Sequence, residues 1–171
     1  MKRITLTIFL FLAVAVAAAA QTNPNVTTSY DAGQDETTIE AAQIPVKSDR
    51  TNRFLGVAIA FKGKKLAAKP GVVMFIISSV NAKGHKYPLA NELIFVADGK
   101  QLGKISILNL DQREFSPTEI LETLGTNMPM DLFKKISTSK APVTFSIAET
   151  PFTLDASVLA ILVDFEKAIT P

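Results

Sequence analysis

The chain has 171 residues, 47% of them hydrophobic, and contains no cysteine, which excludes disulfides and thiolate metal sites. Its 18 basic and 16 acidic side chains give a net charge of +2, too small for the concentrated positive field that nucleic-acid binding requires. Neither glycine-rich phosphate-binding pattern, GxGxxG or GxxxxGK[ST], occurs, so the sequence gives no indication of a nucleotide or other cofactor.

The first twenty residues have the pattern of a secretory signal peptide. A positive Met-Lys-Arg start precedes an almost continuous apolar run over residues 4–17, and three alanines ending at Ala20 provide a cleavage site. The competing hypothesis is an uncleaved anchor, because about 17 apolar residues is the lower limit for crossing a bilayer. We favour cleavage after Ala20. The mature protein would then carry equal numbers of acidic and basic side chains, have no stable membrane span, and reside in the periplasm or extracellular space of a bacterium.

The mature chain is predicted to begin with a disordered leader. Residues 21–36 are mainly Thr, Asn, Ser, Asp and Gly, which cannot bury enough apolar surface to fold. A single domain is predicted over residues 37–171. Its first segment, Thr37–Val46, has weak alternation and a proline, which is typical of an edge strand.

Two strands are predicted next. In Phe54–Phe61, large apolar residues alternate with glycine and alanine, which indicates one large and one small face. Val72–Ile77 is apolar at every position and therefore predicts a strand covered on both faces. Beyond a polar loop, residues 92–97 and 101–108 flank Asp98-Gly99, which predicts a β-hairpin. Residues 109–116 are interpreted as a charged connection.

Residues 116–125 support two interpretations. Ser116, Pro117 and Glu119 have the spacing of a helix capping box with proline in the first turn. Against this, the following residues alternate between two faces and include several threonines, which favours a strand. We favour the strand, because it would pair with its neighbours and lead into a clearer helix over residues 129–138.

The C-terminal third completes the predicted fold. Residues 143–147 alternate as a strand, residues 152–154 return as another, and Asp155 is the expected N-cap of a helix that ends at Ile169. The predicted fold class is α+β, mainly β. It consists of an antiparallel sheet or sandwich of about seven or eight strands, packed by the two helices, one of them C-terminal.

No catalytic residue is predicted. The single histidine, His85, lies in a polar loop, and without a GxSxG motif or a second histidine it supports neither a serine triad nor a zinc site. Five acidic residues are considered as catalytic candidates and are interpreted as turn or solvent-facing positions. They are Asp98, Asp111, Glu114, Glu119 and Glu122. The chain is therefore predicted not to be an enzyme, and a hydrolase that uses two of these carboxylates is kept as an alternative.

Four lysines form the one candidate surface site. Lys62, Lys64, Lys65 and Lys69 lie in one connection between strands and could contact an anionic surface. The leading hypothesis is instead an exported, non-enzymatic module that binds a partner protein, an envelope component or a small apolar ligand. Such a ligand could lie in an apolar pocket between sheet and helices, and an oligomer is compatible with this hypothesis.

Overall fold

A computed structural model describes residues 25–48, 53–82, 92–147 and 150–171. The signal-peptide segment and His85 lie outside these ranges, and so do residues 21–24 of the predicted leader. Within the described ranges most residues lie in strands, and two helices accompany them. The chain is therefore mainly β with antiparallel sheets, as predicted.

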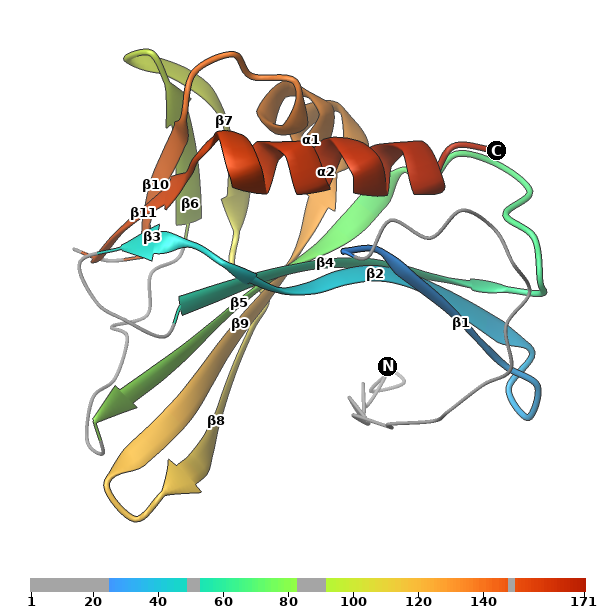
Figure 1. The fold of residues 1–171 in the computed structure, drawn as a ribbon, viewed down its shortest axis with the longest axis horizontal. Coiled ribbons are helices and arrows are strands. Elements are labelled where there is room, and N and C mark those ends of the chain that lie inside the picture. The colour runs from blue at the N-terminus through green and yellow to red at the C-terminus, as the bar shows by residue number, and fades with distance from the viewer. Residues whose placement is uncertain (1–24, 49–52, 83–91, 148–149) are drawn as a thin grey trace, which may run out of the picture.

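The larger sheet has six antiparallel strands in the order β1-β2-β4-β5-β9-β8 (Figure 1). Their bounds are Thr27–Asp31 (β1), Glu36–Pro45 (β2), Arg53–Lys62 (β4), Val72–Ala82 (β5), Asn109–Ser116 (β8) and Glu119–Pro129 (β9). The longest pairing joins β5 to β9, with Val72 opposite Pro129 at one end and Ala82 opposite Glu119 at the other. The strands thus form a continuous surface with one inner and one outer face.

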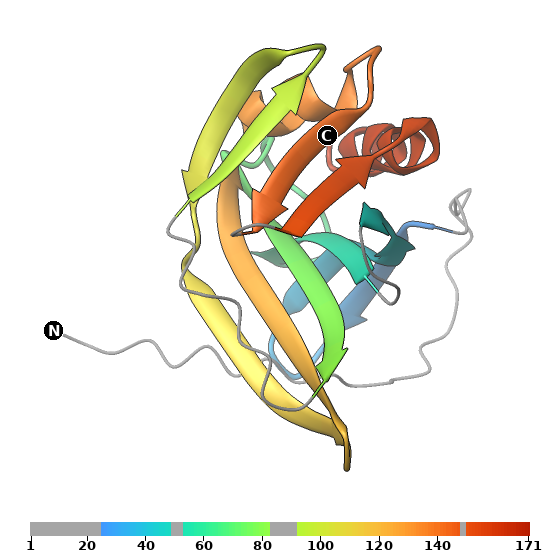
Figure 2. The ribbon, with the colours of Figure 1, turned by 90° about the vertical axis from the view of Figure 1, so that its left-hand side faces the viewer.

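The smaller sheet has five antiparallel strands in the order β3-β11-β10-β6-β7. Their bounds are Lys47–Ser48 (β3), Glu92–Ala97 (β6), Lys100–Ser106 (β7), Val143–Ile147 (β10) and Thr150–Leu154 (β11). In the view of Figure 2 this sheet stands in front of the upper part of the larger sheet, and α2 runs nearly along the line of sight beside it. The described residues therefore form eleven strands in two sheets, more than the seven or eight predicted.

Both predicted helices are present. They are α1, Met130–Ser137, and α2, Ala156–Ala168, and both lie on the inner face of the larger sheet (Figure 1). Asp155 caps α2 as predicted, because its carboxylate accepts hydrogen bonds from the backbone N–H groups of Ser157 (3.0 Å) and Val158 (3.3 Å). Lys47 of β3 forms an ion pair with the same carboxylate at 2.9 Å.

We expect Asp155→Ala to lower the free energy of unfolding by about 1–2 kcal/mol, as for other lost N-caps. Hydrogen bonds from Ser157, Lys47 and Val158 hold the pKa of Asp155 well below its usual range. Its contribution is therefore full above the unfolded pKa of about 4 and is lost as the pH falls below that value. Urea unfolding between pH 7 and pH 2 measures this loss, and Lys47→Ala is the control that removes the ion pair but keeps the cap. Equal pH dependence in Asp155→Ala and the wild type would contradict the assignment.

The β6–β7 hairpin confirms the predicted turn. Asp98 and Gly99 both have positive φ, 50° and 70°, as a two-residue hairpin turn of this kind requires. Glycine reaches such angles without steric cost, and aspartate tolerates them better than most residues. The sequence signal was sufficient here because the turn is purely local.

The ambiguous segment 116–125 is a strand, which confirms the favoured interpretation. Ser116 does contact Glu119, at 3.1 Å, and it accepts a hydrogen bond from the backbone N–H of Thr118 at 3.4 Å. The residues of the apparent capping box thus stabilise the tight turn between β8 and β9. The prediction of a charged connection over residues 109–116 is wrong, because this segment is β8 and pairs with β9.

The predicted leader needs a similar correction. Strand β1 lies inside the segment expected to be disordered, and it pairs with β2 from Thr27 opposite Glu40 to Asp31 opposite Glu36. Ordered structure therefore begins before Thr37. A polar strand of this kind gives no apolar signal in the sequence, because its stability depends on pairing with β2 rather than on burial of its own side chains.

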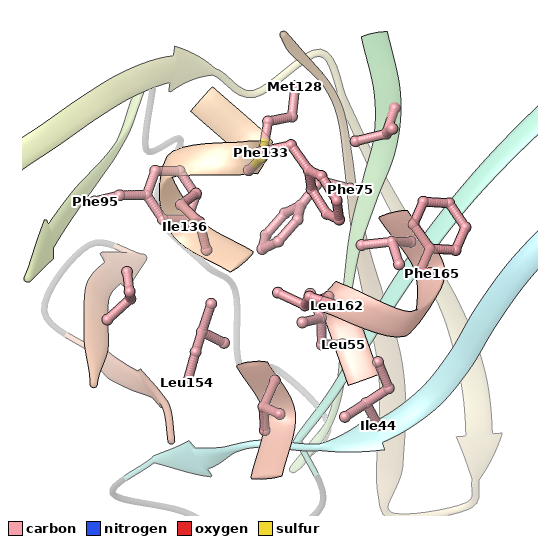
Figure 3. Close-up of a cluster of buried hydrophobic side chains, with 14 of the residues drawn as sticks. Ile44, Leu55, Phe75, Phe95, Met128, Phe133, Ile136, Leu154, Leu162 and Phe165 are labelled. Atoms are coloured by element: carbon pink, nitrogen blue, oxygen red, sulfur yellow. The ribbon is translucent and has the colours of Figure 1, made fainter. Parts of the chain in front are cut away.

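The core lies between the two sheets and the helices. Figure 3 shows Phe75 of β5, Phe95 of β6 and Phe133 of α1 gathered with aliphatic side chains from both sheets and from α2. The rings of Phe75 and Phe95 meet edge to face with centroids 5.6 Å apart, and Phe145 of β10 lies 6.0 Å from Phe75. Phe145 also stacks on Phe152 of β11 at 5.0 Å. Aromatic contacts thus connect the two sheets directly.

Candidate functional site

The outer face of the larger sheet is the one turned away from α1 and α2 (Figure 1). It carries an apolar hollow of about 630 Å³. Its floor is formed mainly by Ala58 of β4 and by Val72, Met74 and Ile76 of β5. These are outward positions, since Val73, Phe75 and Ile77 point into the core. The hollow is therefore a feature of the outer surface and is separate from the core.

This arrangement corrects one prediction. The uninterrupted apolar sequence of Val72–Ile77 predicted cover on both faces, but Val72 is 48% exposed and Met74 and Ile76 are only half-buried. The middle of an antiparallel sheet normally presents polar side chains to water when one face is solvated. Apolar residues at these outward positions therefore identify a surface suited to an interaction.

The rim of the hollow is polar and carries negative charge. Glu36 and Glu40 of β2 stand on one side, and Asn127 of β9 stands on the other. Glu36 pairs with Lys62 at 3.5 Å, whereas Glu40 is exposed and makes no ion pair within the described part of the chain. The site combines an apolar floor with an available carboxylate, which suits a ligand with an apolar body and a positive group.

A second hollow, of about 640 Å³, lies on the smaller sheet. It is lined by side chains of β6, β10 and β11, including Glu92, Ile94, Thr144 and Pro151. Ile94 is 44% exposed, but the residues beside it are mostly polar or carry a short side chain. This surface offers less continuous apolar area than the hollow on the larger sheet, and Ile94 provides a natural comparison for Ile76.

A buried polar cluster occupies the inner face of the larger sheet away from its apolar centre. Arg53, Ser79 and Glu122 lie side by side on β4, β5 and β9, with Arg53 opposite Ser79 and Ser79 opposite Glu122. All three are at most 2% exposed. Arg53 and Glu122 are the two charged side chains buried to this extent among the described residues, and their signs are opposite.

Both carboxylate oxygens of Glu122 accept hydrogen bonds from side-chain amides. Asn81 of β5 donates to one oxygen, and Gln112 of β8 donates to the other at 2.7 Å. Asn81 is itself buried, and its own carbonyl oxygen has no hydrogen-bond partner among the described residues. The cluster thus fixes the position of three strands relative to one another.

The prediction that Glu122 faces solvent is wrong. The alternation that identified the strand also placed Glu122 on the same side as Leu124, Thr126 and Met128, all of which are buried. A glutamate on the otherwise apolar face of a predicted strand was the sequence feature that could have identified this buried polar site. Asp111, Glu114 and Glu119 lie on β8 and at the start of β9, outside the buried set.

The four predicted lysines do not converge on one point. Lys62 contacts the β1–β2 hairpin through Glu36 and through the carbonyl oxygen of Gln34 at 2.9 Å. Lys64 lies over the ring of Tyr30, 5.1 Å from its centroid.

The other two lysines lie apart from this hairpin contact. Lys69 is 3.7 Å from Glu166 of α2, and Lys65 is exposed. Three of the four cations thus face different partners within the chain, which weakens the hypothesis of a shared anionic ligand.

No group of three histidine, aspartate or glutamate side chains within the described ranges is close enough to hold a metal ion. In the same ranges, neither helix combines the length and apolar character needed to cross a bilayer. No protein family, no curated protein and no solved structure matches the chain.

Proposed function

We propose that this protein is an exported, non-enzymatic binding domain whose ligand occupies the hollow on the outer face of the larger sheet. The observation that carries the proposal is the half-exposed apolar floor formed by Val72, Met74 and Ile76 on a central strand. Burial of apolar surface provides about 25 cal/mol per Å², so covering this floor would favour binding. The floor contains no nucleophile, acid or base, which fits binding better than catalysis.

The ligand class that fits is an apolar chain with a positively charged end. The apolar floor would contact the chain, and Glu40 on the rim would attract the charge. Amphipathic cations of this kind include alkylammonium lipids and short apolar peptide segments with a basic residue. The export component of the proposal is supported by the signal-peptide pattern of residues 1–20.

Calorimetric titration with dodecylamine, dodecanol and dodecanoate tests the ligand class. We expect dodecylamine to bind most tightly and dodecanoate most weakly, because the rim carries negative charge. Glu40→Gln should reduce the preference for dodecylamine over dodecanol about threefold without changing dodecanol binding. Equal affinity for all three compounds would contradict the proposed charge selectivity.

A matched pair of substitutions tests the position of the site. We expect Ile76→Ser to weaken dodecanol binding about tenfold, because it removes apolar surface from the floor of the hollow. Ile94→Ser makes the same chemical change at an exposed apolar position on the smaller sheet and should leave binding unchanged. The opposite ranking would move the site to the smaller sheet, and no binding by the wild type would overturn the proposed function.

A further inference from the structure

Strand β8 forms one edge of the larger sheet within the described residues. It is eight residues long, and an edge strand presents backbone N–H and C=O groups that another strand can pair with. The two most exposed large hydrophobic side chains in the described ranges, Leu108 (64%) and Phe115 (60%), stand beside and within this strand. Both the backbone and these side chains therefore favour contact with another strand.

The charges on β8 are complementary to those of a second copy of the same strand. Asp111 and Arg113 are opposite Thr123 and Leu121 of β9, so they share the outer face of the sheet, two residues apart. Both are exposed, and neither forms an ion pair in the described part of the chain. We propose that β8 pairs antiparallel with β8 of a second copy, around a twofold axis that passes Gln112 and is perpendicular to the sheet.

This register is selected by charge. With Gln112 opposite the partner's Gln112, Asp111 stands opposite the partner's Arg113 and Arg113 opposite the partner's Asp111. Moving the axis by one residue along the strand gives the two neighbouring registers. One sets Asp111 opposite the partner's Asp111, and the other sets Arg113 opposite the partner's Arg113. Opposite charges directly across a strand pair stabilise it and like charges destabilise it. One register is therefore favoured and its two neighbours are disfavoured.

The other edge strands in the described ranges are less suited to pairing with a second copy of themselves. Strand β3 has two residues and β1 has five, which gives little backbone to pair. Strand β7 carries two lysines and no acidic side chain, so a symmetric pairing of this edge has no opposite charges to bring together. The mixed charges of β8 make it the edge that fits a second copy best.

The pairing would join two six-stranded sheets into one continuous sheet. Because the twofold axis is perpendicular to the sheet, the outer faces of both copies would lie on the same side. The two hollows would then share one surface, and a ligand or membrane carrying several cationic groups could engage both at once. This inference goes beyond the proposed function and does not depend on it.

Sedimentation velocity over a wide concentration range tests the pairing. The wild type should form a dimer whose population rises with concentration. Asp111→Arg and Arg113→Asp should each weaken dimerisation at least about tenfold, because two attractive pairs become two repulsive ones. The double variant D111R/R113D should dimerise like the wild type, and an equimolar mixture of the two single variants should form a heterodimer.

The controls separate register-specific pairing from nonspecific association. Glu92→Lys makes the same change in net charge as Asp111→Arg but lies on the smaller sheet, and it should leave dimerisation unchanged. Far-ultraviolet circular dichroism verifies that each variant is folded. A wild type that stays monomeric at every concentration would overturn the inference. Failure of both the double variant and the mixture to restore the dimer, with all proteins folded, would overturn it as well.

Discussion

Replacing Phe145 with alanine is expected to lower the free energy of unfolding by about 3–5 kcal/mol. Phe145 lies on β10 and is 3% exposed. Its ring contacts Phe75 of the larger sheet at 6.0 Å, Phe95 at 5.2 Å and Phe152 at 5.0 Å, so it connects the sheets as well as two strands of its own sheet. Truncation would leave a cavity at the junction of the two sheets, where neither can move in without losing its own pairing.

Chemical unfolding in urea measures this effect, and Phe145→Leu is the matched comparison. Leucine keeps most of the volume but loses the aromatic contacts, so we expect a cost of only about 1–2 kcal/mol. If Phe145→Ala cost no more than Phe145→Leu, the volume that this side chain fills between the sheets would contribute nothing to stability. The midpoint of thermal unfolding should fall by about 6–20 °C in the alanine variant.

The elements that could be predicted from sequence are those whose signal is local. The Asp98-Gly99 turn needs positive φ at two adjacent positions, and the two residues that tolerate it stand there. The cap of α2 depends on Asp155 and the two residues after it. Both helices were found because their apolar stripes repeat within a few residues along the chain. In each case the determining interactions lie within one turn or one helix.

The strand pairings could not be predicted in the same way. Strand β5 pairs with β9, and the paired residues are 37 to 57 positions apart in sequence. Strand β10 pairs with β6 through Val143 opposite Ala97. Nothing in either partner's own sequence specifies the other. Strand β8 was missed because a charged edge strand has the composition of a loop, and β1 was missed because its residues are polar. Their structure depends on neighbours rather than on their own side chains.

The candidate site was likewise predictable only in its local part. The apolar run of Val72–Ile77 was recognised, but the sequence could not reveal which of its faces would be covered. Two helices and a second sheet cover the inner face, and Met74 and Ile76 are left on the other. The acidic rim at Glu40 lies two strands away in the sheet, so the combination of apolar floor and negative rim exists only after folding.

The buried cluster around Glu122 leads to the second large expected effect. We expect Glu122→Ala to lower the free energy of unfolding by about 3–5 kcal/mol, because it removes the shared acceptor of two side-chain amides and leaves a buried charge of opposite sign in the same cluster. Two consequences combine. The buried amide of Asn81 loses its acceptor, and the positive charge of Arg53 loses the one buried carboxylate in the described ranges.

A double-mutant cycle with Arg53→Met separates these consequences. If the two buried charges stabilise each other across Ser79, the variant R53M/E122A should be less destabilised than the sum of the single variants by about 1–3 kcal/mol. Glu122→Gln removes the charge but keeps one acceptor oxygen, so it should cost less than Glu122→Ala by about 1 kcal/mol. If the losses of unfolding free energy in Glu122→Ala and Arg53→Met were strictly additive, the two charges would act independently. In that case the cluster would be held by its amide hydrogen bonds alone, to which both Asn81 and Gln112 contribute.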